Sequence, residues 1–335
     1  MTRTDAELTA AAKQAGELLA TEKSAAVQRQ IKALDDMLSS VTLLEPLSFD
    51  RLVVTPAVAK FDPGQLGVAL TAPAWESYAP ARPAGLRRLT GRSRYKQRLD
   101  RARAEYENAR TAYLRAESQR GRALVAAKAK HDREVTGEHA RAAAQNAEVA
   151  RRRVAFADGD RESVEWFVDR AVAASRYLKV FPRDYQVAYE PKTVHVTAEL
   201  PPGGIVPSAR AFRYIASRDI IEPVPRPDEE IRQRYRRFVC AAALRVLHTV
   251  FAATPAEVVD AVGFSGCVGS ADPATGKAVR PCLVSVTAAR AAFSELVLTS
   301  VEPVTCLEYL AGVVSPDPFG LQACAVTPDP RAGRS

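Results

Sequence analysis

CAAALRVLHTVFAA, residues 240–253, is apolar on nearly every side. A helix of this composition has no face suited to water and is typical of a helix buried against a sheet. It completes a helix predicted from about Asp228 to Ala252. The first half of that helix exposes four arginines, Arg232, Arg234, Arg236 and Arg237. The segment therefore predicts a layer of sheet in the residues around it.

Alternating apolar residues predict the strands of that sheet. Residues 185–200 read as a hairpin, because Tyr185, Val187 and Tyr189 alternate on its first half and valines alternate on its second. Further strands are predicted at about 210–216, 257–268 and 279–288, and further helices at 161–177, 289–296 and 303–313. Helices that follow and cover a mostly antiparallel sheet predict an α+β fold.

The first 157 residues read differently. Residues 5–42 carry apolar side chains three or four apart, which predicts an amphipathic helix. Residues 44–85 hold six prolines but keep Phe49, Phe61, Trp75 and Tyr78, so we expect an extended arm that docks on another surface.

A long helical rod is predicted over residues 86–157. An a/d heptad series runs from Leu99 to Ala116, and a second frame with period seven runs from Val135 to Phe156. The frames do not join cleanly around Gly121, which predicts a stutter or a bend. Two interpretations of the apolar seam stay open: packing on the N-terminal helix as a helical hairpin, or self-association as a coiled coil.

The charge of the chain is concentrated in this rod. Residues 85–153 contain 19 Lys and Arg against 8 Asp and Glu, while the whole chain has a net charge of +8. Such a rod suits contact with a polyanion. The candidate nucleic-acid-binding residues are a basic cluster formed by Arg87, Arg88, Arg92, Arg94, Lys96, Arg98, Arg101 and Arg103. Cations at a helix start oppose the helix dipole, a conflict that a bound anion would remove. The alternative is that these charges only keep the rod soluble.

No catalytic or metal-binding pattern stands above background. Asp184, Glu190 and Lys192 have the order of a metal-dependent nuclease set, but Pro191 indicates a hairpin tip. His248 lies in an apolar helix and reads as a core residue.

Two other candidate motifs fail on spacing. Gly276 and Lys277 lack the spacing of a phosphate loop, and Ser265 lacks the GxSxG pattern of a nucleophile elbow. We expect no cofactor, no metal and no catalytic residue.

The five cysteines form no CxxC pair, so a zinc site is not expected. Cys267 and Cys282 are symmetric about the turn DPATGK (272–277) and should face each other across a hairpin. We expect two reduced thiols buried beneath the helix that contains Cys240.

The expected organisation is an N-terminal helix (1–43), a docking arm (44–85), a basic rod (86–157), an α+β domain (158–318) and a flexible tail (319–335). No stretch has the length and apolarity of a membrane span, and the N-terminus lacks the order of a signal peptide. We therefore expect a cytoplasmic protein with no membrane partner.

Four stretches together resemble a known family. They are FDPGQLGV (61–68), FPRDYQVAYEPKTVHVTAELPP (181–202), RYIASRDIIEPVPRPDEEIRQRY (213–235) and DPATGKAVRPCLVSVTAARAAFSEL (272–296). The chain resembles, over about residues 45–318, the N-terminal region of bacterial Mrr-type restriction endonucleases, whose nuclease domain follows that region.

The resemblance implies a non-nuclease module of a restriction or defence system, and no catalytic residue carries over to this chain. Expected partners are the DNA phosphate backbone, a nuclease partner protein and a second copy of the chain. The alternative is a structural coiled-coil scaffold with no nucleic-acid role.

Overall fold

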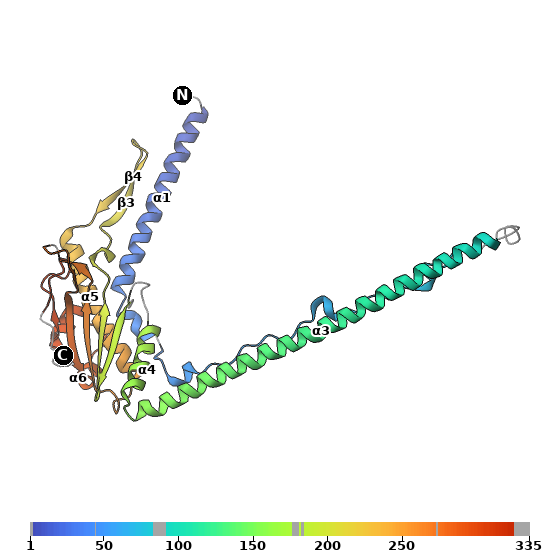
Figure 1. Cartoon of the computed structure of the whole chain (residues 1–335). Helices are drawn as coiled ribbons and strands as arrows, with labels where there is room; N and C mark the ends of the chain where they lie inside the picture. Colours follow the sequence, from blue (N-terminus) through green and yellow to red (C-terminus); the bar gives the residue numbers. More distant parts are fainter. Residues whose placement is uncertain are drawn as a thin grey trace. The chain divides into compact units, whose positions relative to one another are not determined.

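The computed structural model describes residues 3–43, 45–82, 92–175, 181, 184–272 and 274–324. The chain divides into two compact units, whose elements are labelled in Figure 1. The sheet unit comprises Met1–Leu52 and Val149–Ser335, and the rod unit comprises Val53–Glu148. The long helix α3 (Arg92–Ala157) contributes residues to both.

A five-stranded sheet forms the centre of the sheet unit. Its strands, in spatial order, are β1 (Tyr185–Glu190), β2 (Thr193–Glu199), β5 (Ala261–Cys267), β8 (Cys282–Ala289) and β9 (Val313–Val314). β2 and β5 run parallel, and the other neighbouring strands run antiparallel. The protein is therefore α+β, with the mostly antiparallel sheet that the sequence predicts.

Helix α5 (Asp228–Ala253) packs against β5 and β8, as its apolar half predicts. Leu244, Leu247 and Val250 are completely buried in the shared core. The first turn holds three acidic residues, which favour the positive end of the helix dipole. Helix α4 (Arg161–Ala174) packs beside α5 and against β1. α6 (Arg290–Ser294) and α7 (Pro303–Tyr309) are shorter than predicted.

The sheet face that points away from α5 is polar. Successive side chains of a strand point to opposite faces, so Val194, Val196 and Ala198 are buried while the residues between them are not. A cavity of about 360 Å³ lies on this polar face, and its lining includes His195, Thr197, Ser265 and Ser285. Because Ser265 lies within β5, which continues to Cys267, the structure offers no nucleophile elbow there.

Helix α1 (Arg3–Asp35) packs on a separate two-stranded ribbon, β3 (Ala209–Ile215) and β4 (Ile220–Pro225). The strand expected at 210–216 therefore exists but does not join the main sheet. The Ser24 hydroxyl accepts a hydrogen bond from the main-chain N–H of Phe212 at 2.8 Å. The Gln28 amide donates to the main-chain oxygen of Arg210 at 3.0 Å. These two contacts fasten the edge of β3 to the helix.

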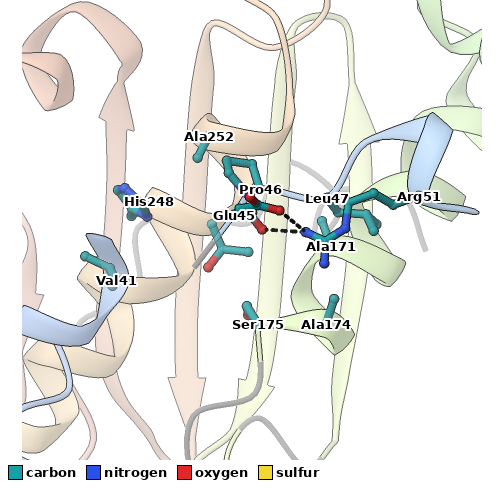
Figure 2. Close-up of a pocket in the computed structure, with 11 residues that line it drawn as sticks. Val41, Glu45, Pro46, Leu47, Arg51, Ala171, Ala174, Ser175, His248 and Ala252 are labelled. Atoms are coloured by element: carbon teal, nitrogen blue, oxygen red, sulfur yellow. Dashed lines mark hydrogen bonds and ion pairs between the residues drawn. The ribbon is translucent and has the colours of Figure 1, made fainter. Parts of the chain in front are cut away.

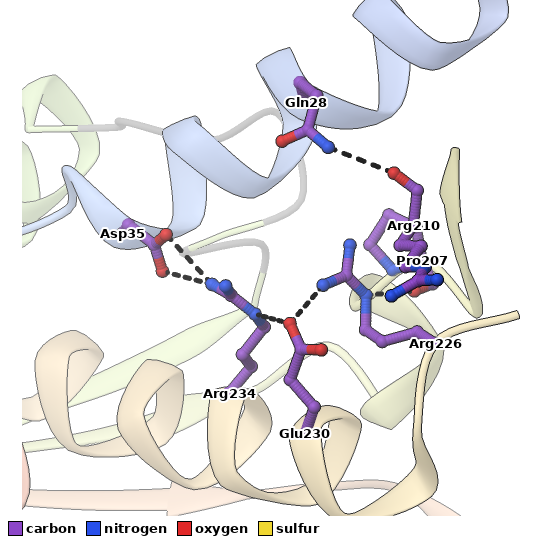
Figure 3. Close-up of polar contacts among 7 residues, drawn as sticks. All are labelled: Gln28, Asp35, Pro207, Arg210, Arg226, Glu230 and Arg234. Carbon is purple, nitrogen blue, oxygen red and sulfur yellow. Dashed lines mark hydrogen bonds and ion pairs between the residues drawn. The ribbon is translucent and has the colours of Figure 1, made fainter. Parts of the chain in front are cut away.

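An ionic chain joins α1, α5 and the connection between β4 and α5, as Figure 3 shows. The Arg234 guanidinium donates two hydrogen bonds of 2.9 Å to the carboxylate of Asp35, and a third of 2.9 Å to Glu230. Glu230 also accepts from Arg226, whose side chain is only 4% exposed. Arg226 additionally donates to the main-chain oxygen of Pro207 at 3.2 Å. One carboxylate therefore neutralises two arginines, one of which is buried.

Cys267 and Cys282 face each other across β5 and β8, which confirms the predicted register. The pairing shifts by one residue between Gly266 and Cys267, and both thiols are free and buried. Their location was predicted incorrectly. They cluster with Cys324 rather than beneath the helix of Cys240, which belongs to the main core.

The segment after α7 returns to the sheet unit instead of leaving it. The main-chain N–H of Cys324 donates to the oxygen of Cys282 at 2.8 Å, and the Phe319 ring packs edge-on to Tyr235. Residues 325–335 of the predicted tail lie outside the described residues.

Candidate nucleic-acid interface

The basic cluster coincides with the start of α3. Its six described members are exposed, namely Arg92, Arg94, Lys96, Arg98, Arg101 and Arg103. Arg87 and Arg88 lie outside the described residues. The first turn of α3 contains no acidic residue, so the dipole conflict inferred from the sequence is present in the structure.

Few contacts neutralise these cations. Arg101 lies 3.3 Å from Glu105, but the two side chains are 83% and 59% exposed, and such pairs contribute little. The other five side chains make no hydrogen bond or ion pair with any residue that the structure describes. Five positive charges thus remain open to solvent at one end of the rod unit.

The proline-rich arm lies along α3, and Figure 1 shows it following the helix. The Asn146 side chain accepts from the N–H of Val54 at 2.8 Å and donates to its oxygen at 2.9 Å. Further along, the ring of Phe61 packs on His131, with ring centroids 5.5 Å apart. The Asn146 side chain therefore bonds both the main-chain N–H and the main-chain oxygen of Val54, as the backbone of a neighbouring strand would.

Two further contacts continue the series towards the start of α3. Arg120 donates to the main-chain oxygen of Leu66 and to Glu117, while Glu117 accepts from the N–H of Leu70 at 3.3 Å. These hydrogen bonds, that from Arg120 first, lower the pKa of Glu117 to about 2. Near the end of the described arm, Trp75 and Tyr78 both pack edge-on against Tyr106.

The spacing of these contacts shows that the arm is extended. From Asn146 back to Tyr106, α3 rises about 60 Å at 1.5 Å per residue. The arm covers the same length between Val54 and its contacts at Trp75 and Tyr78. It therefore advances roughly 2.7 Å per residue, close to the 3.1 Å of a polyproline helix. The short 3-10 turns Gly64–Gly67 and Trp75–Ser77 account for the difference.

The arm of the same chain packs on the apolar seam of the rod, an arrangement that neither sequence interpretation of that seam included. Within the sheet unit, α1 packs on β3 and β4. Ala102 is 7% exposed and Tyr106 is half-buried, because the arm covers the heptad series. α3 is unbroken through Gly121, so the change of frame is a stutter within one continuous helix.

The acidic set that resembles a nuclease site is dispersed. Asp184 precedes β1 and Glu190 ends it, so about 20 Å of strand separates them at 3.4 Å per residue. Pro191 and Lys192 form the turn of the β1–β2 hairpin, and Lys192 has a positive φ of 63°. The hairpin tip predicted from Pro191 is therefore confirmed. These side chains cannot share one metal ion.

The rejected phosphate loop is also a hairpin turn. It connects β6 (Ser270–Ala271) to β7 (Ala278–Val279), and no helix follows it. The Asp272 carboxylate accepts from the N–H groups of Ala274 and Thr275 at 2.9 and 2.8 Å, and Gly276 has a φ of 67°.

His248 lines a cavity of about 350 Å³ in the sheet unit, drawn in Figure 2. Burial lowers the pKa of His248, and the charge of Arg245 lowers it further, so both favour the neutral imidazole. The neighbouring Ser175 and Thr249 hydroxyls donate to main-chain oxygens within their own helices. Among the described residues, His248 is hydrogen-bonded to no nucleophile or carboxylate, so no catalytic dyad is formed.

Sequence patterns carry no signal for the roles of three arginines, of which Arg226 and Arg245 are buried and Arg290 is half-buried. Arg226 belongs to the ionic chain. Arg245 is 3% exposed and donates to the oxygen of Met37 at 2.7 Å. Arg290 donates to the oxygens of Phe251 and Val259 at 2.8 and 2.7 Å. Each bonds main-chain oxygens far away in the sequence, which no local pattern encodes.

Comparison with known proteins found no counterpart: no family model, no curated protein and no solved structure matches this chain. Within the described ranges, no helix is both long enough and apolar enough to cross a membrane. The same residues contain no group of three or more His, Cys, Asp and Glu side chains suited to a metal ion.

Proposed function

We propose that the protein binds duplex DNA through the phosphate backbone, using the exposed cations at the start of α3. The observation that carries this proposal is the division of charge between the two units. Val53–Glu148 contains 18 Lys and Arg against 10 Asp and Glu, a net charge of +8. The remainder contains 29 of each sign, so the rod unit holds the whole net charge of the chain.

The environment of these cations supports the same function. A basic helix start with no acidic neighbour in its first turn is electrostatically unfavourable in isolation. Phosphates would neutralise it and release their condensed counterions, which is the main source of sequence-independent affinity. Backbone contacts carry no base information, so we expect weak preference among sequences.

The scaffold alternative loses its main support. A coiled-coil scaffold needs a free apolar seam, whereas the arm of the same chain already contacts Tyr106 and Arg120 of the first heptad series. The resemblance to Mrr-type endonucleases favours the DNA reading and suggests a nuclease as the protein partner. The proposed role is therefore a DNA-associating, non-nuclease module of a restriction or defence system.

The test compares two quadruple variants of the full chain. Arg92, Arg94, Lys96 and Arg98→Glu reverses the proposed contact. Arg122, Lys128, Lys130 and Arg133→Glu makes the same charge change on exposed positions of the same helix. The two groups lie about 50 Å apart along α3, several times the Debye length of about 10 Å at 0.1 M salt.

Binding to a labelled 30-base-pair duplex is measured by fluorescence anisotropy at 0.1 M salt. We expect the first variant to lose roughly two orders of magnitude in affinity and the control variant to lose less than tenfold. Circular dichroism checks that both keep the helix, since Glu and Arg have similar helix propensities. Equal losses in both variants would refute a contact centred on the start of α3.

A further inference from the structure

We infer that residues 92–111 of α3 lie in the major groove of duplex DNA, with one row of cations on each wall. This inference rests on the proposed function, because it specifies how the same side chains meet the duplex. Four faces of the helix carry the argument: two basic rows, the face covered by the arm and the face opposite it.

The cations form two rows rather than one patch. An α-helix turns about 100° per residue, so Arg92, Lys96 and Arg103 lie in one row, which Arg110 continues. Arg94, Arg98 and Arg101 lie in a second row, about 170° around the axis from the first. All six side chains are exposed, so both rows are open to a partner.

The arm covers one of the two faces between the rows. Leu99 and Tyr106 are half-buried and Ala102 is 7% exposed, and Tyr106 contacts the arm through Trp75 and Tyr78. A duplex therefore cannot approach this part of α3 from the face that the arm covers.

That opposite face carries no cation. It presents Ser93, Gln97, Ala104, Asn108 and Thr111, all exposed, together with Asp100 and Glu107. A helix lying flat on one strand would place cations at the centre of its contact face. Here the cations flank a face of amide, hydroxyl, methyl and carboxylate groups, which are the groups that meet base edges in a major groove.

The dimensions agree with this arrangement. An α-helix with its side chains is about 10–12 Å across, and the major groove is about 12 Å wide. The segment 92–111 is roughly 30 Å long, close to one turn of duplex DNA at about 34 Å. Arginine and lysine at both flanks then reach the phosphates of opposite strands.

The first experiment separates the rows. Arg92, Lys96 and Arg103→Glu reverses three cations of one row, and Arg94, Arg98 and Arg101→Glu reverses three cations of the other, with the same change of charge. Log affinity falls as log salt rises, with a slope of about −0.9 for each phosphate contact. We expect each variant to make this slope less steep by two to three units on duplex DNA. A loss confined to one row would overturn groove entry, because it would mean that α3 contacts a single strand.

The second experiment blocks the open face without changing charge. Ala104→Trp places an indole on that face, and Ala126→Trp places one on a similar face about four turns beyond Thr111; both alanines are exposed. We expect Ala104→Trp to weaken duplex binding at least tenfold and Ala126→Trp to leave it within twofold. In the wild-type complex, guanine N7 atoms, which lie in the major groove, should be protected from dimethyl sulfate.

The outcomes distinguish the two proposals. Absence of duplex binding by the wild-type chain would refute the proposed function itself. Binding that depends on both rows but ignores Ala104→Trp, with unprotected guanine N7, would leave phosphate contact standing and refute groove entry.

Discussion

Removing Glu230 should unfold the sheet unit at markedly lower denaturant. Its carboxylate accepts from both Arg226 and Arg234, and the Arg226 side chain is 4% exposed. Glu230→Ala leaves the Arg226 guanidinium with only the main-chain oxygen of Pro207 as a hydrogen-bond partner among the described residues. Arg234 still has its two hydrogen bonds to Asp35, so the substitution mainly destabilises the buried guanidinium of Arg226.

The expected loss of stability depends on the burial of Arg226 and on the partial exposure of Glu230. Breaking a fully buried ion pair costs about 3–5 kcal/mol, because an uncompensated charge stays in the interior. The Glu230 side chain is 37% exposed, so water offsets part of that cost. We expect a loss of about 2–3 kcal/mol in the free energy of unfolding, which corresponds to roughly 4–12 °C in Tm for a domain of 150–250 residues.

Urea unfolding followed by tryptophan fluorescence measures this loss. A Trp75→Phe background leaves Trp166 of α4 as the single tryptophan, and it reports on the sheet unit alone. Glu229→Ala is the matched control, because it removes another acidic residue of the same helix turn, one whose only described side-chain contact is with Gln233 on the surface. The control should change stability by less than about 0.5 kcal/mol.

The pH dependence adds an independent check. The hydrogen bond from Arg234, followed by that from Arg226, lowers the pKa of Glu230 from its ordinary value of 4.5. A lowered folded-state pKa stabilises the protein above the unfolded value, and that stability is lost as pH falls through the folded value. The difference between wild type and Glu230→Ala should therefore shrink as pH falls below 4.5 and through the lower folded-state pKa of Glu230. Equal stability of the Glu229 and Glu230 variants at pH 7 would refute the reasoning.

Three other predictions test separate parts of the structure. Gly263→Ala should destabilise the sheet unit by about 1–2 kcal/mol, since the added Cβ would lie 2.2 Å from Nδ1 of His195, and a His195→Ala background should remove most of that cost. At pH 8, iodoacetamide should modify Cys267 before Cys240, as measured by peptide mapping. The hydrogen bond from the Cys282 thiol lowers the pKa of Cys267 to about 7, while burial raises the pKa of Cys240 to about 12. Modification in the reverse order would contradict this. Plasmid DNA should stay intact with Mg²⁺ or Mn²⁺, whereas cleavage that Glu190→Ala abolishes would contradict the dispersed acidic set.

Local patterns predicted those parts of the fold that depend on neighbouring residues. Helix α5, the β1–β2 hairpin and the pairing of Cys267 with Cys282 follow from apolar periodicity and turn symmetry. The same reasoning misplaced these thiols relative to Cys240, because their third neighbour, Cys324, comes from a distant segment.

Long-range partners were beyond the sequence patterns. The heptad series of α3 indicates that something covers its seam, but it fits a second helix as well as an extended arm. Trp75 and Tyr78 were the available signal, since aromatics in a proline-rich segment indicate docking. The exposure of the basic cluster was predictable from charge alone. Its division into two rows required the helix phase and the position of the arm.

The salt dependence of duplex binding tests the central claim most directly. The slope of log affinity against log salt is measured between about 50 and 200 mM for the wild-type chain and for Arg92, Arg94, Lys96 and Arg98→Glu. Each phosphate contact adds about −0.9 to that slope, so the wild type should be steeper by three to four units. A wild-type slope near zero, or the same slope in both proteins, would contradict phosphate binding at the start of α3.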